Sequence, residues 1–178
     1  MTKRAMPAGR QGFTLIEILI YITVLAMLFL AVSSFITWTT KSGAKARAIR
    51  EVADNERRAM EIITSEIRGA RSVYIPTSTS TQLSLETSRY LPAGETSTYI
   101  DFYLCGEAAS TLCLKKESQN PLAITSARVN ISHLVFTQIS TTTPSIQINF
   151  EIDYNTPAQQ PEYQASMSAT STASLRSY

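Results

Sequence analysis

The feature that most constrains the fold is an apolar run near the N-terminus that carries one carboxylate. The run begins Gly12-Phe13-Thr14-Leu15-Ile16-Glu17 and continues to about Ile36. At 1.5 Å per residue, residues 13–36 would form about 36 Å of helix, enough to cross a hydrocarbon core of roughly 30 Å. Trp38 then falls at the far interface, where an amphipathic ring is favoured. The sequence therefore predicts a transmembrane helix over residues 13–38.

Glu17 needs a partner, because an ionised side chain at mid-bilayer costs roughly 2.5 to 3.5 kcal/mol on insertion scales. The basic residues upstream all lie before Gly12, the last of them being Arg10, and nothing positive follows until Lys41. Cleavage after Gly12 would create a new α-amine on Phe13. Four residues of helix would place that amine roughly 6 Å from Glu17 along the axis.

A short basic leader followed by Gly-Phe-Thr-Leu-Ile-Glu resembles the cleavage and methylation signature of type IV pilins and type II secretion pseudopilins. In that family a prepilin peptidase cuts after the glycine, and the new N-terminal residue is N-methylated. The glutamate neutralises the α-amine of a neighbouring subunit during fibre assembly. The resemblance thus implies cleavage between Gly12 and Phe13, N-methylation of Phe13, and an assembly salt bridge through Glu17.

Three other interpretations compete for the same residues. A secretory signal peptide would have an apolar region of only about 7 to 15 residues, and this run is longer. An ordinary anchor helix would explain the length but would leave Glu17 and the string around it without a role. A chance match is the third, and the position of the string, at the start of the membrane-length run and behind a basic leader, argues against it.

Charge alone does not orient the chain, since basic residues lie on both sides of the run. They are Lys3, Arg4 and Arg10 before it and Lys41, Lys45, Arg47 and Arg50 after it. The head is expected outside because the leader is short and because the family's peptidase acts at the cytoplasmic face. The resemblance thus implies a single-pass protein of the inner (cytoplasmic) membrane with an extracytoplasmic head, incorporated into a pilus or pseudopilus.

Processing changes the net charge of the chain. The 16 basic and 14 acidic side chains give +2, and loss of the three basic leader residues leaves 13 against 14, or −1. A nearly neutral chain has no electrostatic footprint for nucleic acid.

An amphipathic continuation of the helix is predicted over residues 39–75. The segment Thr37–Gly43 is poor helix-forming material and predicts a bend or a loosened stretch. One face of the helix collects Ile49, Val52, Ala53, Ala59, Met60, Ile63, Ile67, Ala70 and Tyr74, and the opposite face Arg47, Glu51, Asp54, Arg58, Glu61 and Ser65. Glu56 interrupts the apolar stripe and is interpreted as projecting beyond the head, with a second inter-subunit contact as the alternative. Gly69 and Pro76 bracket the end of the helix.

Beyond Pro76 the composition becomes rich in Ser, Thr and alternating apolar residues, which predicts antiparallel strands. Strands are expected over 81–87, 98–105, around Leu112 and Leu114, over 129–139 with both faces covered or a bulge, and over 145–153. The tail from Tyr163 is either a last strand or disordered. The domain prediction is a cleaved leader (1–12), the transmembrane helix (13–38), the helix continuation (39–75) and a β-rich head with a polar tail (76–178). The fold class is α+β, with a long helix packed on a small antiparallel head.

The resemblance also extends to particular subunits of the family. Residues 56–71 resemble the helix of the larger minor subunits, the J-type pseudopilins and W-type minor pilins. Glu17 argues against the K-type tip subunit, which lacks this carboxylate. The C-terminal region has no acidic cluster resembling the calcium site of major pseudopilins.

Cys105 and Cys113 are the chain's two cysteines and flank the predicted loop of a hairpin. In an oxidising exterior a disulfide here would contribute about 2 to 3 kcal/mol. Two buried thiols are the alternative, since spacing does not report the Cα separation. Two cysteines without further ligands do not make a zinc site.

No catalytic or cofactor motif is recognisable, and no metal or cofactor is expected. His133 lies in a predicted strand without an identifiable nucleophile or acid, so it is interpreted as a structural or surface residue. The prediction is a non-enzymatic minor pilin or pseudopilin of a type IV pilus, competence pilus or type II secretion pseudopilus. Its expected partners are prepilin peptidase, other pilins, the inner-membrane assembly platform and lipid. The alternative is a pilus-displayed adhesin or DNA-capturing subunit.

Overall fold

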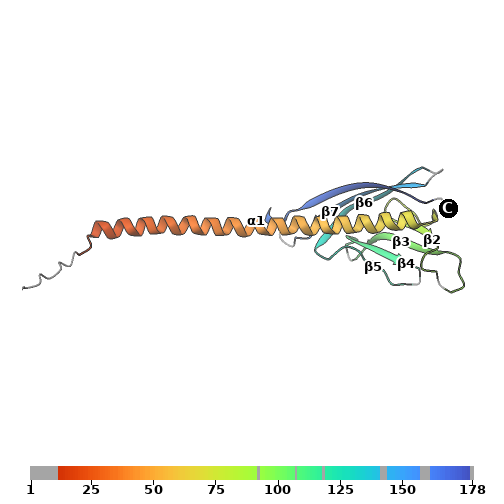
Figure 1. Cartoon of the computed structure of the whole chain (residues 1–178), viewed down its shortest axis with the longest axis horizontal. Helices are drawn as coiled ribbons and strands as arrows, with labels where there is room; N and C mark the ends of the chain where they lie inside the picture. Colours follow the sequence, from red (N-terminus) through yellow and green to blue (C-terminus); the bar gives the residue numbers. More distant parts are fainter. Residues whose placement is uncertain are drawn as a thin grey trace, which may run out of the picture. The chain divides into compact units, whose positions relative to one another are not determined.

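The computed structural model describes residues 12–91, 93–106, 108–117, 119–140, 144–156 and 161–176. By its internal contacts the chain divides into two compact units, Met1–Ser42 and Gly43–Tyr178. The long helix α1 (Leu15–Gly69) begins in the first unit and ends in the second, whose other elements are antiparallel strands and the short 3-10 helix η1 (Pro161–Tyr163) (Figure 1). The predicted α+β fold with a pilin-like architecture is confirmed.

The strands of the second unit form two antiparallel sheets. The first sheet has the order β1-β2-β3-β4-β5, with β1 at Ser72–Val73, β2 at Leu83–Thr87, β3 at Thr98–Cys105, β4 at Thr111–Lys116 and β5 at Leu122–Ala123. The second has the order β6-β7-β8, with β6 at Val129–Ser140, β7 at Ser145–Tyr154 and β8 at Ser166–Ser174. The short strands β1 and β5 were not predicted. The last strand of the tail is present as β8.

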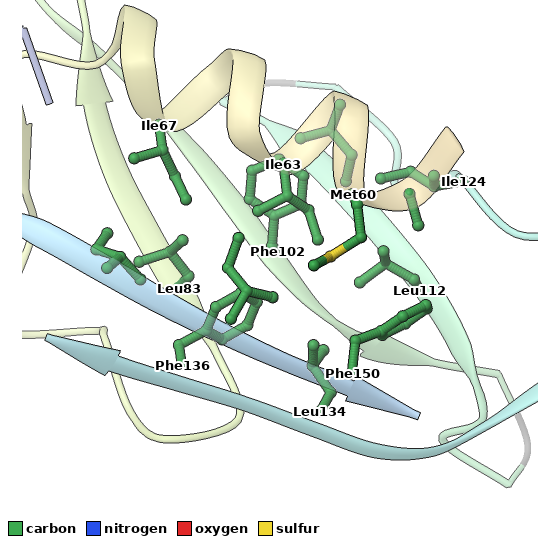
Figure 2. Close-up of a cluster of buried hydrophobic side chains, with 14 of the residues drawn as sticks. Met60, Ile63, Ile67, Leu83, Phe102, Leu112, Ile124, Leu134, Phe136 and Phe150 are labelled. Atoms are coloured by element: carbon green, nitrogen blue, oxygen red, sulfur yellow. The ribbon is translucent and has the colours of Figure 1, made fainter. Parts of the chain in front are cut away.

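The second half of α1 packs on the sheets through the apolar stripe that its sequence predicts. Met60, Ile63 and Ile67 are buried and point from the helix toward the strands (Figure 2). Ile49 was assigned to this stripe but is 45% exposed, whereas Ala48 is 1% exposed. Successive side chains on a helix differ in direction by about 100°. Where Ala48 faces the head, the side chain of Ile49 therefore points away from it.

The helix runs through residues 37–43, where a bend or loosening was expected. The threonine hydroxyls there donate to carbonyls of the preceding turn: Thr37 Oγ1 to Ser34 O at 2.9 Å, Thr39 Oγ1 to Phe35 O at 2.8 Å, and Thr40 Oγ1 to Thr37 O at 2.9 Å. These bonds satisfy the hydroxyls locally, and the helix continues through the segment to Gly69.

The helix ends at Gly69, one of the two residues expected to bracket its end, and residues 70–75 of the predicted 39–75 continuation lie outside it. The chain turns at Ala70, whose N–H donates to Ile67 O at 3.2 Å, and the N–H of Arg71 then pairs with Glu86 O at 2.7 Å. Pairing with β2 begins at this point, and the strand hydrogen bonds replace those of another helical turn.

The core lies between α1 and the inner faces of both sheets. The side chains of Phe102, Leu112, Phe136 and Phe150 converge there with those of the helix (Figure 2). Alternation along β7 is as predicted, with its four inward positions all buried: Ile146, Ile148, Phe150 and Ile152. For β6 the sequence left two alternatives, covered faces or a bulge, and the pairing with β7 has register shifts at 131–133 and 138–140.

A polar contact also anchors the helix to the loop before β6. Asn55 Oδ1 accepts from the N–H of Ser126 at 2.9 Å, and Glu51 Oε1 accepts from Ser126 Oγ at 3.0 Å. Arg128 lies 3.7 Å from Glu51 Oε2. The sequence placed Glu51 on the outward face of the helix, and its contact with a residue 75 positions away was not foreseeable from local pattern.

Candidate processing and assembly site

The predicted cleavage position lies just before the helix. Gly12, Phe13 and Thr14 precede α1, which begins at Leu15 rather than at Phe13 as the sequence suggested. The carbonyl of Thr14 accepts the first helical bonds, from the N–H groups of Glu17 at 3.1 Å and of Ile18 at 3.3 Å. Because Phe13 lies before the helix, the distance of roughly 6 Å that the helical rise predicted between its nitrogen and Glu17 does not apply.

The peptide bond between Gly12 and Phe13 is accessible within the described residues. A Cβ placed on Gly12 would meet no atom within 4 Å, and the Phe13 side chain is 73% exposed. Residues 1–11, the rest of the predicted leader, lie outside the described residues. The Gly12–Phe13 bond lies outside α1, which begins at Leu15.

Glu17 lies in the first turn of α1, where the positive end of the helix dipole favours a carboxylate. Its side chain is half-buried, and its Oε1 accepts a hydrogen bond from Tyr21 Oη at 3.0 Å. Sequence reasoning missed Tyr21, although the i, i+4 spacing that brings two helical side chains together was visible. The hydroxyl supplies one partner for the carboxylate and leaves its other oxygen, Oε2, for a cation.

The helix around Glu17 presents apolar side chains on every side. Its most apolar 18-residue window has a mean hydropathy of 2.7, and no residue of that window is buried. Among the described residues α1 is long and apolar enough to cross a membrane, by length and composition. Fully exposed apolar surface on every face does not fit the core helix of a soluble protein, which hides at least one face.

Comparison with known proteins adds a sequence match over this same segment. Residues 7–33 match the family model of the prokaryotic N-terminal methylation motif. The matched segment includes Gly12, Phe13 and Glu17 and most of the apolar run, and it supports a type IV pilin-like family. Searches of curated proteins and of solved structures found no significant match. The motif and the N-terminal apolar helix are together consistent with a pilin anchored in the inner membrane.

The other predicted residues lie in the head. Cys105 on β3 and Cys113 on β4 are joined by a disulfide, with their Cα atoms 5.9 Å apart. The disulfide closes a hairpin loop in which Gly106 has a φ of 90°, a conformation that glycine adopts without strain. His133 is exposed on β6 and lies opposite Glu151 of β7. These residues all belong to the second unit, Gly43–Tyr178.

Proposed function

We propose that this chain is a minor pilin or pseudopilin, a structural subunit that prepilin peptidase cuts between Gly12 and Phe13. The methylation motif at the start of a helix with wholly exposed apolar surface is the observation that carries the proposal. In this proposal Phe13 becomes the N-methylated first residue. Residues 13–38 span the inner membrane, and the β-rich head lies on the extracytoplasmic side.

Assembly then follows from the surface of the helix. In lipid the apolar side chains of residues 13–38 contact acyl chains, and in a fibre they contact the helices of other subunits. Glu17 pairs with the α-amine of a neighbouring subunit. Two unit charges 4 Å apart attract by about 4 kcal/mol at an effective dielectric constant of about 20, which offsets part of the cost of enclosing both in the bundle. Tyr21 holds the carboxylate by one oxygen and leaves the other for the amine.

The proposed subunit type rests on the similarity of residues 56–71 to J-type and W-type minor subunits. Its role is structural rather than catalytic, as in the family whose motif it carries. The proposed partners are the peptidase, other pilins and the inner-membrane assembly platform. They would recognise the leader and the apolar helix and need not contact the head.

Mass spectrometry of the intact protein after co-expression with a prepilin peptidase tests this proposal. We expect the chain to lose its first twelve residues and to gain one methyl group on Phe13. Gly12→Ala should still be cut, and Gly12→Leu should not, because the peptidase requires a small residue. Gly9→Leu changes a second glycine of the leader and should be cut normally. A chain that stays uncut, or that begins at a residue other than Phe13, would refute the proposal.

A further inference from the structure

The head contains a cleft lined by arginine side chains. It has a volume of about 680 Å³ and lies along the side of α1 next to the core-facing stripe. We call it the arginine cleft and define it by its lining residues, which are Glu56, Arg57, Met60, Glu61, Thr64, Ser65, Arg68, Arg89 and Arg176. Glu56, expected to project beyond the head, is instead half-buried here. The cleft therefore lies within the head itself.

Three of these arginines have no acidic partner in the part of the chain that is described. The ion pair found there joins Arg128 to Glu51, outside the cleft, and neither Arg57, Arg68 nor Arg89 forms one. A guanidinium presents several donors in a plane that matches a carboxylate. Because arginines from different segments outnumber the glutamates that line this cleft, they favour an anionic partner from outside the chain.

The Arg89 guanidinium lies against a glycine at the end of α1. A Cβ on Gly69 would collide with the Cζ, Nη1 and Nη2 atoms of Arg89, so the guanidinium lies against the helix where a side chain would otherwise be. The backbone N–H of Arg89 donates to Thr87 Oγ1 at 3.1 Å, which fixes the start of this loop beside β2. Arg68 lies in the last turn of α1, where the negative end of the helix dipole favours a cation. The Arg89 guanidinium thus lies against the last turn of α1, the turn that also contains Arg68.

The balance of charges in the cleft indicates the kind of anion. Four arginines line it together with two glutamates, Glu56 and Glu61. A nucleic acid backbone carries a negative charge at every phosphate and would be repelled where the glutamates lie. A peptide can place carboxylates beside the arginines and neutral or basic side chains beside the glutamates.

We infer that the arginine cleft is a docking site for an acidic segment of another protein, with Arg68 and Arg89 binding its carboxylates. Arginine–carboxylate pairs of this kind set the orientation of a partner as well as adding affinity. The inference extends the proposed function by giving the head a contact of its own, separate from the contacts of the N-terminal helix.

Binding of a labelled hexaglutamate peptide to the full chain in detergent tests the inference, with hexaglutamine as the neutral control. We expect hexaglutamate to bind, hexaglutamine not to bind, and the affinity to fall as salt is raised. The double variant Arg68→Gln/Arg89→Gln should weaken binding by about tenfold. Gly69→Ala should weaken it as well, because the methyl group displaces the Arg89 guanidinium.

Arg58→Gln/Arg71→Gln is the matched control, since both arginines are exposed and neither lines the cleft. It removes the same charge and should retain binding within about twofold. Absence of hexaglutamate binding, or an equal loss in both double variants, would overturn the inference. Tighter binding of a single-stranded oligonucleotide than of hexaglutamate would also overturn it, in favour of nucleic acid. The assay uses uncut chain, so its result is independent of processing.

Discussion

Two isoleucines of α1 test which face of its second half packs on the sheets. Ile63 is 0% exposed and belongs to the core, whereas Ile49 is 45% exposed. Replacing either with alanine removes the same atoms and changes helix propensity by the same small amount. The difference between the two variants therefore reports burial alone.

The structure sets the expected magnitudes. Ile63→Ala should lower the free energy of unfolding by about 3 kcal/mol, because it removes buried methyl groups and leaves a cavity between helix and sheets. Ile49→Ala opens no enclosed cavity and should cost less than about 1 kcal/mol. With a urea slope of about 2 kcal/mol per molar, the midpoint should fall by about 1.5 M for Ile63→Ala and by less than about 0.5 M for Ile49→Ala.

Urea unfolding of residues 43–178, followed by circular dichroism, makes the measurement. Glu61→Ala serves as a polar control, since its side chain is exposed and makes no ion pair within the described residues. It should remain within about 0.5 kcal/mol of the parent protein. Equal midpoints for the Ile63 and Ile49 variants would show that the helix does not pack through the stripe described above.

Two further predictions concern the N-terminal helix and the hairpin of the head. Glu17→Val should leave membrane insertion intact, because it removes a charge from the membrane segment, but should reduce the amount of subunit in sheared fibres; normal incorporation would exclude the salt bridge. Replacing Cys105 and Cys113 together with serine should lower the stability of the head by about 2 to 3 kcal/mol in chemical unfolding, and an unchanged midpoint would show that the disulfide adds no stability.

The parts of the fold that the sequence predicted are those in which apolar and polar residues alternate regularly. Strand β7 alternates without error between Ser145 and Asp153, and its inward residues are all buried. Strand β3 was predicted with its observed bounds, Thr98–Cys105. In both cases one face of the strand is apolar and continuous, so a single register buries it.

What the sequence could not predict depends on contacts between distant residues. Strands β1 and β5 have two residues each, too few for a period, and exist because neighbouring strands offer hydrogen bonds. The arginine cleft likewise combines Arg68 with Arg89 and Arg176 from separate loops. By contrast, Gly12, Phe13 and Glu17 lie within six consecutive residues, so a candidate processing site could be recognised from sequence alone.

The core of the head has a consequence for biosynthesis, because it joins residues that are synthesised far apart in time. Val52 of α1 and Leu175, which follows β8, belong to the same buried cluster. Until Leu175 has emerged, the helix and the earlier strands lack part of the surface that covers them, and their apolar faces stay open to solvent. Domains generally fold as units. Under the proposed topology the head can therefore complete its core on the far side only after its C-terminal segment has crossed the membrane.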